Sequence, residues 1–238
     1  MIDFGQIYVQ AVTLFDDPEI KQAYDDNKIE FDKLMYPFLN ASFSLFTQPF
    51  LIGGVLCDFL EPDGKMEIFD SDGITNTFEL SFVPLENSLF EFKEDGKVIE
   101  GIYNSNDNSV TFPHVLENNK EYSFESYFPG CFKSDFKITG NKNLDTIIRN
   151  QVISILARML VRAWGENNRN FLLDIQNILR DSEFSLHPAS AALNSKDKWL
   201  KHLEEEIYQL QNKLSHNLRF ASNSDWVRRF NWYEKIEI

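Results

Sequence analysis

The sequence is short of basic residues and cysteines, and it has no long apolar run. Its 23 lysines and arginines are outnumbered by 37 aspartates and glutamates, which gives a formal net charge of −14. Such a chain repels DNA phosphates, so a nucleic-acid-binding protein that works by neutralising phosphates is excluded. The two cysteines, Cys57 and Cys131, could pair, but two free buried thiols in a reducing cytoplasm are the simpler expectation.

No segment predicts a signal peptide or a membrane span. The start, MIDFGQIYVQ, has no basic region followed by a long apolar run. The longest apolar stretch, Val152–Trp164, is interrupted by Ser154, Arg158 and Arg162 and is too short to cross a bilayer. We therefore expect no membrane contact.

What the sequence does have is helical periodicity at both ends. The apolar content is 43%, with 22 phenylalanines among 238 residues, which is enough for a folded core. In residues 1–48, apolar side chains recur every three or four positions in three short segments. Asp3 and Asp17 are placed to cap the first two helices, and Pro18 suits a first helical position.

The second helical block, residues 141–222, has the stronger pattern. Leu144–Trp164 is apolar on nearly every face, as expected of a central helix, and Gly165 is placed to end it. A further helix is expected near Phe171–Leu179, followed by a non-helical bridge at Glu183–Ser195. The longest helix, about Lys196–Arg219, carries a narrow seam of apolar residues typical of two helices packed lengthwise: Leu200, Leu203, Ile207, Leu210 and Leu214.

Strand and turn patterns fill the middle of the chain. Phe78, Leu80 and Phe82 alternate with polar residues, and Asp95-Gly96 is a strong hairpin signal. We expect five to eight antiparallel strands in a small sandwich or barrel.

The predicted fold class is therefore α+β. Residues 1–48 and 141–222 would form a discontinuous helical bundle, because neither segment can bury its apolar stripes alone. Residues 49–140 would form the inserted antiparallel β domain, and residues 223–238 a C-terminal docking arm.

Motifs for catalysis or metal binding are nearly absent. The chain has no phosphate-binding glycine loop, no paired Cys-x-x-Cys, no H-E-x-x-H and no G-x-S-x-G. His202 and Glu206 lie one helical turn apart, but an exposed helix face explains them better than a metal site. Asp70–Gly73 faintly resembles a calcium loop, and a β-turn is favoured. We predict no catalytic residue, cofactor or metal, and therefore no enzyme.

The C-terminal tail is rich in the residue types that dominate protein interfaces. The candidate interface residues are Trp226, Arg228, Arg229, Phe230, Trp232 and Tyr233, together with Trp164 from the central helix. The tail either folds back onto its own core or docks on a neighbour, and the docking arm is slightly favoured. Its arginines and aromatics also suit single-stranded nucleic acid, but the net charge opposes that interpretation.

Three segments resemble the neck proteins, or head–tail connectors, of tailed bacteriophages. They are DFGQIYVQAVTLFDD at the start, IIRNQVISILARMLVRAW at Ile147–Trp164, and DSEFSLHPASAALNSKDKWLKHLEEEIYQL at Asp181–Leu210. In that family a tryptophan closes the apolar helix, as Trp164 does, and a serine-led segment precedes the last helix, near Ser190 and Leu193. The resemblance covers about half of the chain and is greatest to ring or adaptor proteins of short-tailed, crAss-like phages.

The resemblance implies a structural virion protein that joins the portal to the tail. It implies a cyclic homo-oligomer, with a dodecamer expected, which contacts the portal and further neck or tail proteins and surrounds the DNA exit channel. DNA would pass through without sequence-specific binding, and assembly would take place in the host cytoplasm. The apolar helix surface, including Trp164 and the Leu203–Leu214 row, would be covered by sister copies around the ring axis. The alternative is a host- or carbohydrate-binding accessory protein that uses the β domain, and a hydrolase built on residues such as Asp58, Glu61 and Asp63 comes third.

Overall fold

The structure is a computed structural model with helices and antiparallel sheets, which confirms the predicted α+β class. It describes residues 2–15, 17–46, 50–70, 73–117, 120–134, 141–180 and 187–221. The chain divides into two compact units. The helical unit comprises Met1–Leu60 and Cys131–Ile238, and the β unit comprises Glu61–Gly130.

The helical unit has six helices in the part of the chain that is described. They are α1 (Phe4–Leu14), α2 (Pro18–Asp26), α3 (Lys28–Leu45), α4 (Phe50–Leu56), α5 (Lys142–Arg180) and α6 (His187–Ala221). The predicted caps of the first two helices are confirmed, since Asp3 accepts a hydrogen bond from the Gly5 amide at 2.7 Å and Asp17 accepts one from the Glu19 amide at 2.9 Å.

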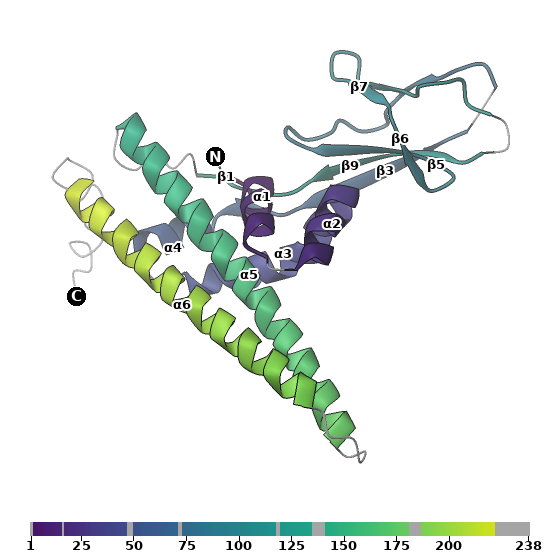
Figure 1. Ribbon diagram of the computed structural model, residues 1–238. Coiled ribbons are helices and arrows are strands. Elements are labelled where there is room, and N and C mark those ends of the chain that lie inside the picture. The colour runs from purple at the N-terminus through teal and green to yellow at the C-terminus, as the bar shows by residue number, and fades with distance from the viewer. Residues whose placement is uncertain are drawn as a thin grey trace, which may run out of the picture. The chain divides into compact units, whose positions relative to one another are not determined.

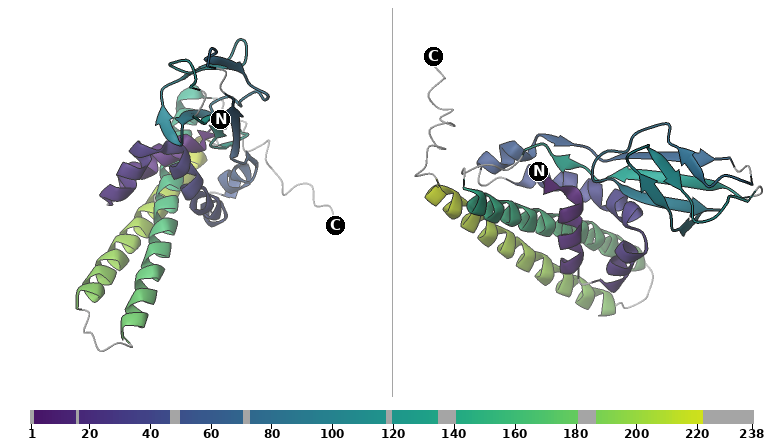
Figure 2. Two further views of the ribbon diagram at one scale, coloured as in Figure 1. Left: turned by 90° about the vertical axis from the view of Figure 1, so that its right-hand side faces the viewer. Right: turned by 90° about the horizontal axis from the view of Figure 1, so that it is seen from above.

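Helix α5 is the centre of the helical unit. α1 and α3 pack on it from the N-terminal half of the chain, and α6 lies along it in an antiparallel hairpin (Figures 1 and 2). Its fully buried side chains point in several directions around the helix and include Ile148, Val152, Ile155, Leu156, Leu160 and Val161. The prediction of an apolar central helix covered by both chain ends is confirmed.

The prediction that Gly165 ends this helix is wrong, because α5 continues without a break to Arg180. Gly165 serves packing instead. A β-carbon at this position would lie 2.6 Å from the Trp199 ring and 2.9 Å from the Leu200 side chain. The missing side chain therefore lets α6 approach α5 closely, a tertiary role that a local capping pattern cannot reveal.

Two further boundaries differ from the predictions. The expected non-helical bridge at Glu183–Ser195 is wrong from His187 onward, where α6 begins, because Pro188 is tolerated in the first turn of a helix. Residues 50–56, assigned to the β domain, form α4, and the compact β unit spans 61–130 rather than 49–140.

A small three-stranded sheet lies where the chain leaves and re-enters the helical unit. It has the order β1 (Ile2–Asp3), β10 (Cys131–Phe132) and β2 (Phe59–Leu60), and its pairs are antiparallel. Phe59 and Phe132 join Phe4 in an aromatic cluster, with the Phe4 and Phe132 ring centroids 5.0 Å apart. The two ends of the insertion are thus held side by side by a strand from the N-terminus.

The β unit has seven antiparallel strands among its described residues, within the predicted five to eight. One sheet has the order β3 (Asp63–Phe69), β9 (Tyr122–Phe128), β5 (Leu89–Glu94), β6 (Lys97–Ile99). The other has the order β4 (Thr77–Glu79), β8 (Ser109–Thr111), β7 (Ile102–Asn104). Asp95 and Gly96 join β5 to β6 with positive φ at both residues, which confirms the predicted hairpin.

We predict opposite effects of alanine at two helical glycines. Gly165→Ala should lower the free energy of unfolding by about 1–3 kcal/mol, because overpacking against Trp199 exceeds the gain in helix propensity. Gly54→Ala in α4 is the matched control: no atom lies within 4 Å of its added β-carbon, so stability should stay level or rise by up to about 1 kcal/mol. Urea unfolding followed by circular dichroism measures both, and equal effects would remove the packing role of Gly165.

Candidate functional site

The predicted interface residues of the C-terminal tail lie outside the described residues. This applies to Trp226, Arg228, Arg229, Phe230, Trp232 and Tyr233. Their role as a docking arm therefore stays a prediction.

Trp164 is half-buried and has contacts within its own chain. Its ring meets Phe15 edge to face, with centroids 5.0 Å apart, and the Lys196 ammonium lies 4.7 Å from its centroid. A cation so placed over an indole face is attracted to it. These contacts tie α1, α5 and α6 together and account for the position of Trp164 without a neighbouring copy.

The apolar seam of α6 is also satisfied inside one chain, so the expectation that it is left for sister copies is wrong. Leu203 and Leu214 are 4% and 0% exposed, and the rest of the row is buried or packed against the same core. The partner is the Leu144–Trp164 part of α5 itself, because across the two helices Arg158 pairs with Glu206 and Asn217 donates to Gln151. The sequence predicted the seam correctly and its partner wrongly.

Exposed apolar side chains instead concentrate in the β unit. Of the fifteen large hydrophobic residues that are exposed in the described parts, nine belong to this unit of 70 residues. The nine are Met66, Ile68, Ile74, Val83, Leu85, Phe90, Val98, Ile102 and Val115. Single exposed residues need no explanation, but three of the nine, Phe90, Val98 and Ile102, lie around one cleft, and such a group marks a binding surface.

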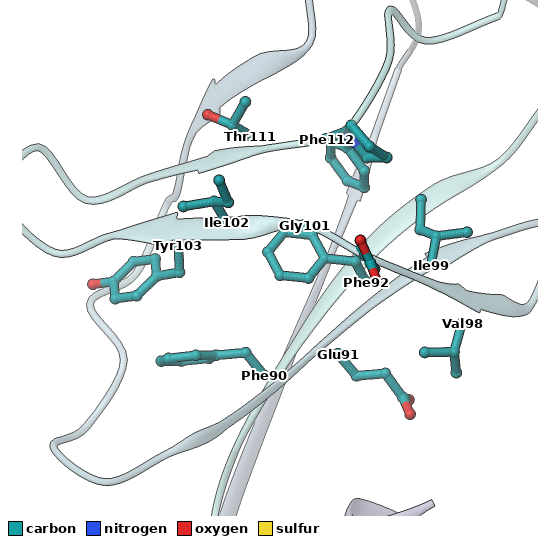
Figure 3. Close-up of a pocket in the computed structure, with 12 residues that line it drawn as sticks. Phe90, Glu91, Phe92, Val98, Ile99, Gly101, Ile102, Tyr103, Thr111 and Phe112 are labelled. Carbon is teal, nitrogen blue, oxygen red and sulfur yellow. The ribbon is translucent and has the colours of Figure 1, made fainter. Parts of the chain in front are cut away.

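Such a cleft opens between the two sheets of the β unit (Figure 3). It has a volume of about 570 Å³, and its apolar lining includes Phe90, Phe92, Val98, Ile102, Tyr103 and Phe112. The Phe90 and Tyr103 ring centroids are 4.8 Å apart, and Phe90 stacks on Phe124 at 5.6 Å. Phe90 is nevertheless 41% exposed, so the aromatic cluster reaches the surface here.

The cleft exists because the chain changes sheets after β6. β6 pairs with Phe92–Glu94 only, so Leu89–Glu91 of β5 has no strand partner on that side among the described residues. The chain then crosses at Gly101 into β7. A β-carbon on Gly101 would lie 2.3 Å from the Phe92 ring, so only glycine fits this crossing. β7 pairs with β8 alone, which leaves its other edge open as well.

The charges at the cleft are acidic. The charged residues that line it are Glu91 and Glu100. Glu91 is buried and pairs with Lys93, whose ammonium also donates to Glu125 at 3.1 Å. Partial burial disfavours the charged form of Lys93, but the hydrogen bonds that its ammonium donates to the Glu91 and Glu125 carboxylates outweigh this effect and raise the pKa of Lys93. Glu100 is exposed and has no ion pair in the part of the chain that the structure describes.

A second, smaller opening lies on the helical unit between the end of α3 and the α5–α6 pair. Its volume is about 200 Å³, and it is flanked by Leu45 and Tyr208, which are 51% and 65% exposed. Gln211 is 9% exposed, and its Nε2 finds no acceptor among the described atoms. A carbonyl oxygen from a bound segment would satisfy this donor.

The most perturbed carboxyl group lies in the helical core, away from either opening. Asp32 of α3 is 2% exposed. Burial, and then the nearby charge of Asp3, raise the pKa of Asp32 to about 7 despite the opposing charge of Lys28. Burial likewise raises the pKa of Asp3, against the effect of its hydrogen bond from Gly5. Both residues serve the helical core, so they are structural rather than catalytic candidates.

The remaining candidates contribute no further site. Cys57 and Cys131 are free thiols; Cys131 is buried as expected, but Cys57 is exposed. His202 is exposed and lies 3.5 Å from Glu206, which also pairs with Arg158. No group of three potential metal ligands occurs within the described ranges. In the same ranges, no helix combines the length and apolar character needed to span a membrane.

Comparisons with protein-family models, with curated proteins and with solved structures found no match for this chain.

We predict that Asp32 makes stability depend on pH. Because its pKa rises from the ordinary value of 3.8 to about 7 on folding, the folded state holds this proton more tightly. The resulting stabilisation is complete below pH 4 and is lost as pH rises to about 7. Between pH 5 and pH 8 the free energy of unfolding should fall by about 2–3 kcal/mol on this account, and Asp32→Asn should remove that fall.

Urea unfolding at the two pH values measures the difference. Asp26→Asn is the control, since it removes an exposed carboxylate from the neighbouring helix α2 with the same change in net charge. Equal pH dependence in the two variants would exclude Asp32 as the cause.

Proposed function

We propose that this protein is a non-catalytic structural subunit of a ring in the neck of a tailed bacteriophage. The ring would join the portal to the tail and surround the channel through which DNA leaves. The proposal starts from the resemblance of the α1, α5 and α6 sequences to head–tail connectors. The structural observation that carries it is the open, apolar cleft of the β unit, with exposed hydrophobic residues around it.

The cleft supports a protein neighbour rather than a reaction. Its lining is mainly aromatic and aliphatic, and it holds two carboxylates, Glu91 and Glu100, but no histidine or cysteine. Aromatic anchors in a desolvated opening are the usual centre of a protein interface. The β unit would therefore contact another subunit or a neighbouring neck or tail component.

The helical unit would supply the wall of the ring. Its hairpin of α5 and α6 is stiff because the apolar seam is packed within one chain, so rings would form from subunits that are already folded. The groove between Leu45 and Tyr208 is the part of this unit left for a lateral contact. The net charge of −14 would keep a channel wall from holding DNA phosphates.

We expect mass photometry of the purified protein to show a closed oligomer, alone or after mixing with portal protein. Negative-stain class averages of that species should have rotational symmetry. A strict monomer at every concentration, indifferent to portal, would contradict the proposed function.

Deleting residues 225–238 should weaken ring assembly and leave the far-UV circular dichroism of the monomer largely intact. The expectation follows from the interface-type residues of the arm, Trp226–Tyr233. Unchanged assembly would remove the arm from the proposal while leaving the ring itself in place.

The second candidate is a host- or carbohydrate-binding accessory protein. The exposed Phe90 ring in the cleft favours it, because aromatic faces also stack on sugars. Glycan-array binding by the full-length protein that is lost in Phe90→Ala, together with a monomeric state, would support this candidate against the ring.

A further inference from the structure

We infer that the cleft of the β unit receives the C-terminal arm of a second copy of this chain as an added β-strand. The inference rests on the proposed function, which places copies side by side. It adds to the proposed function by naming the segment and the surface that form one contact between subunits.

The cleft offers main-chain pairing to an incoming strand. Leu89–Glu91 of β5 and the outer edge of β7 are both without strand partners in the described part of the chain, and the cleft lies between them. In the antiparallel pattern set by the β5–β6 hairpin, the N–H and C=O of Phe90 point toward this open side. An extended segment would satisfy them, as in other cases of strand addition.

The arm has the side-chain pattern of such a strand. In an extended chain, alternate residues share a face, so Trp226, Phe230 and Trp232 would lie on one side together with Arg228. Two residues of a strand span about 7 Å, so Phe230 and Trp232 would present neighbouring rings. The cleft is lined by aromatic rings, Phe90 and Tyr103 among them, against which these would pack.

One charge of the cleft is complementary to the charges of the arm. Of the two carboxylates that line the cleft, Glu91 pairs with Lys93, whereas Glu100 is exposed and has no ion pair among the described residues. The arm carries Arg228 and Arg229 next to its aromatic residues. The chain outside the described residues is also long enough for the contact, since 17 residues follow Ala221 and span up to about 55 Å when extended.

Cross-linking between full-length variants tests the contact. In a Cys57→Ser background, one variant carries Ile102→Cys at the cleft, where the native side chain is 68% exposed. The other carries Asn231→Cys in the arm, which spares the aromatic face. After mixing and treatment with a short bismaleimide, we expect a product of twice the subunit mass that contains one copy of each variant.

In the matched control, the cysteine of the β unit is introduced as Val83→Cys instead of Ile102→Cys. Val83 is 70% exposed in the same unit but does not line the cleft. Cross-linking that is absent, or equal for the two positions, overturns the inference. A variant with both Ile102→Cys and Asn231→Cys that links only within one chain overturns the assignment to a second copy.

A charge in the cleft supplies an independent measurement. Ile102→Lys removes an apolar side chain and adds an ammonium at an exposed position, so the fold should survive, as circular dichroism will show. The added charge repels the arginines of the arm, so the yield of cross-link between Val98→Cys, also at the cleft, and Asn231→Cys should fall at least about tenfold when Ile102→Lys is added. An unchanged yield argues against the cleft as the arm's site.

Mass photometry of the same samples distinguishes a failure of this inference from a failure of the proposed function. Rings without the specific cross-link refute the inference and leave the proposed function standing. A monomer without any cross-link refutes both.

Discussion

The structure depends on one constraint: the Leu144–Trp164 part of α5 carries buried apolar residues on nearly every face, and these must be covered from several sides. No single neighbour can do this. α6 covers one side along its length, and α1 and α3 cover others, so both ends of the chain must meet on this helix. The small sheet of β1, β10 and β2 adds a further link between distant segments, because it pairs the N-terminal strand with the two ends of the insertion. The middle of the chain is left free to fold as a separate unit.

The pairing of α5 with α6 combines close packing with ion pairs at its margins. Gly165 admits Trp199 and Leu200, while Arg158 pairs with Glu206 at 2.8 Å and Arg169 pairs with Asp197. Partly exposed ion pairs contribute at most about 1 kcal/mol each, so the buried seam supplies most of the stability. The charges are better understood as fixing the register of the two helices.

The β unit has its own core, and this allows it to keep an open side. Phe69, Phe112 and Phe124 fill the space between its sheets, so the unit does not need the Leu89–Glu91 edge to be covered in order to fold. An unpaired strand edge beside an apolar opening favours pairing with a strand of another chain, and proteins normally protect such edges. Here the opening is the most distinctive surface that the molecule presents, which is why both the proposed ring contact and the inferred arm contact involve it.

Features that depend only on neighbours along the chain follow from the amino-acid sequence. Capping by Asp3 and Asp17, the Asp95-Gly96 turn and the apolar character of Leu144–Trp164 on nearly every face were predictable, because each is set by a few consecutive residues or by one helical period. The aromatic and arginine content of residues 226–233 is likewise read from composition alone, and their role as a docking arm stays a prediction. Contacts between distant segments, in contrast, make Gly165 a packing position, cover the Leu203–Leu214 row within one chain, and open a cleft at the strand crossing at Gly101. Those outcomes depend on which distant segment fills the space beside a residue, and periodicity along the chain carries no information about that partner.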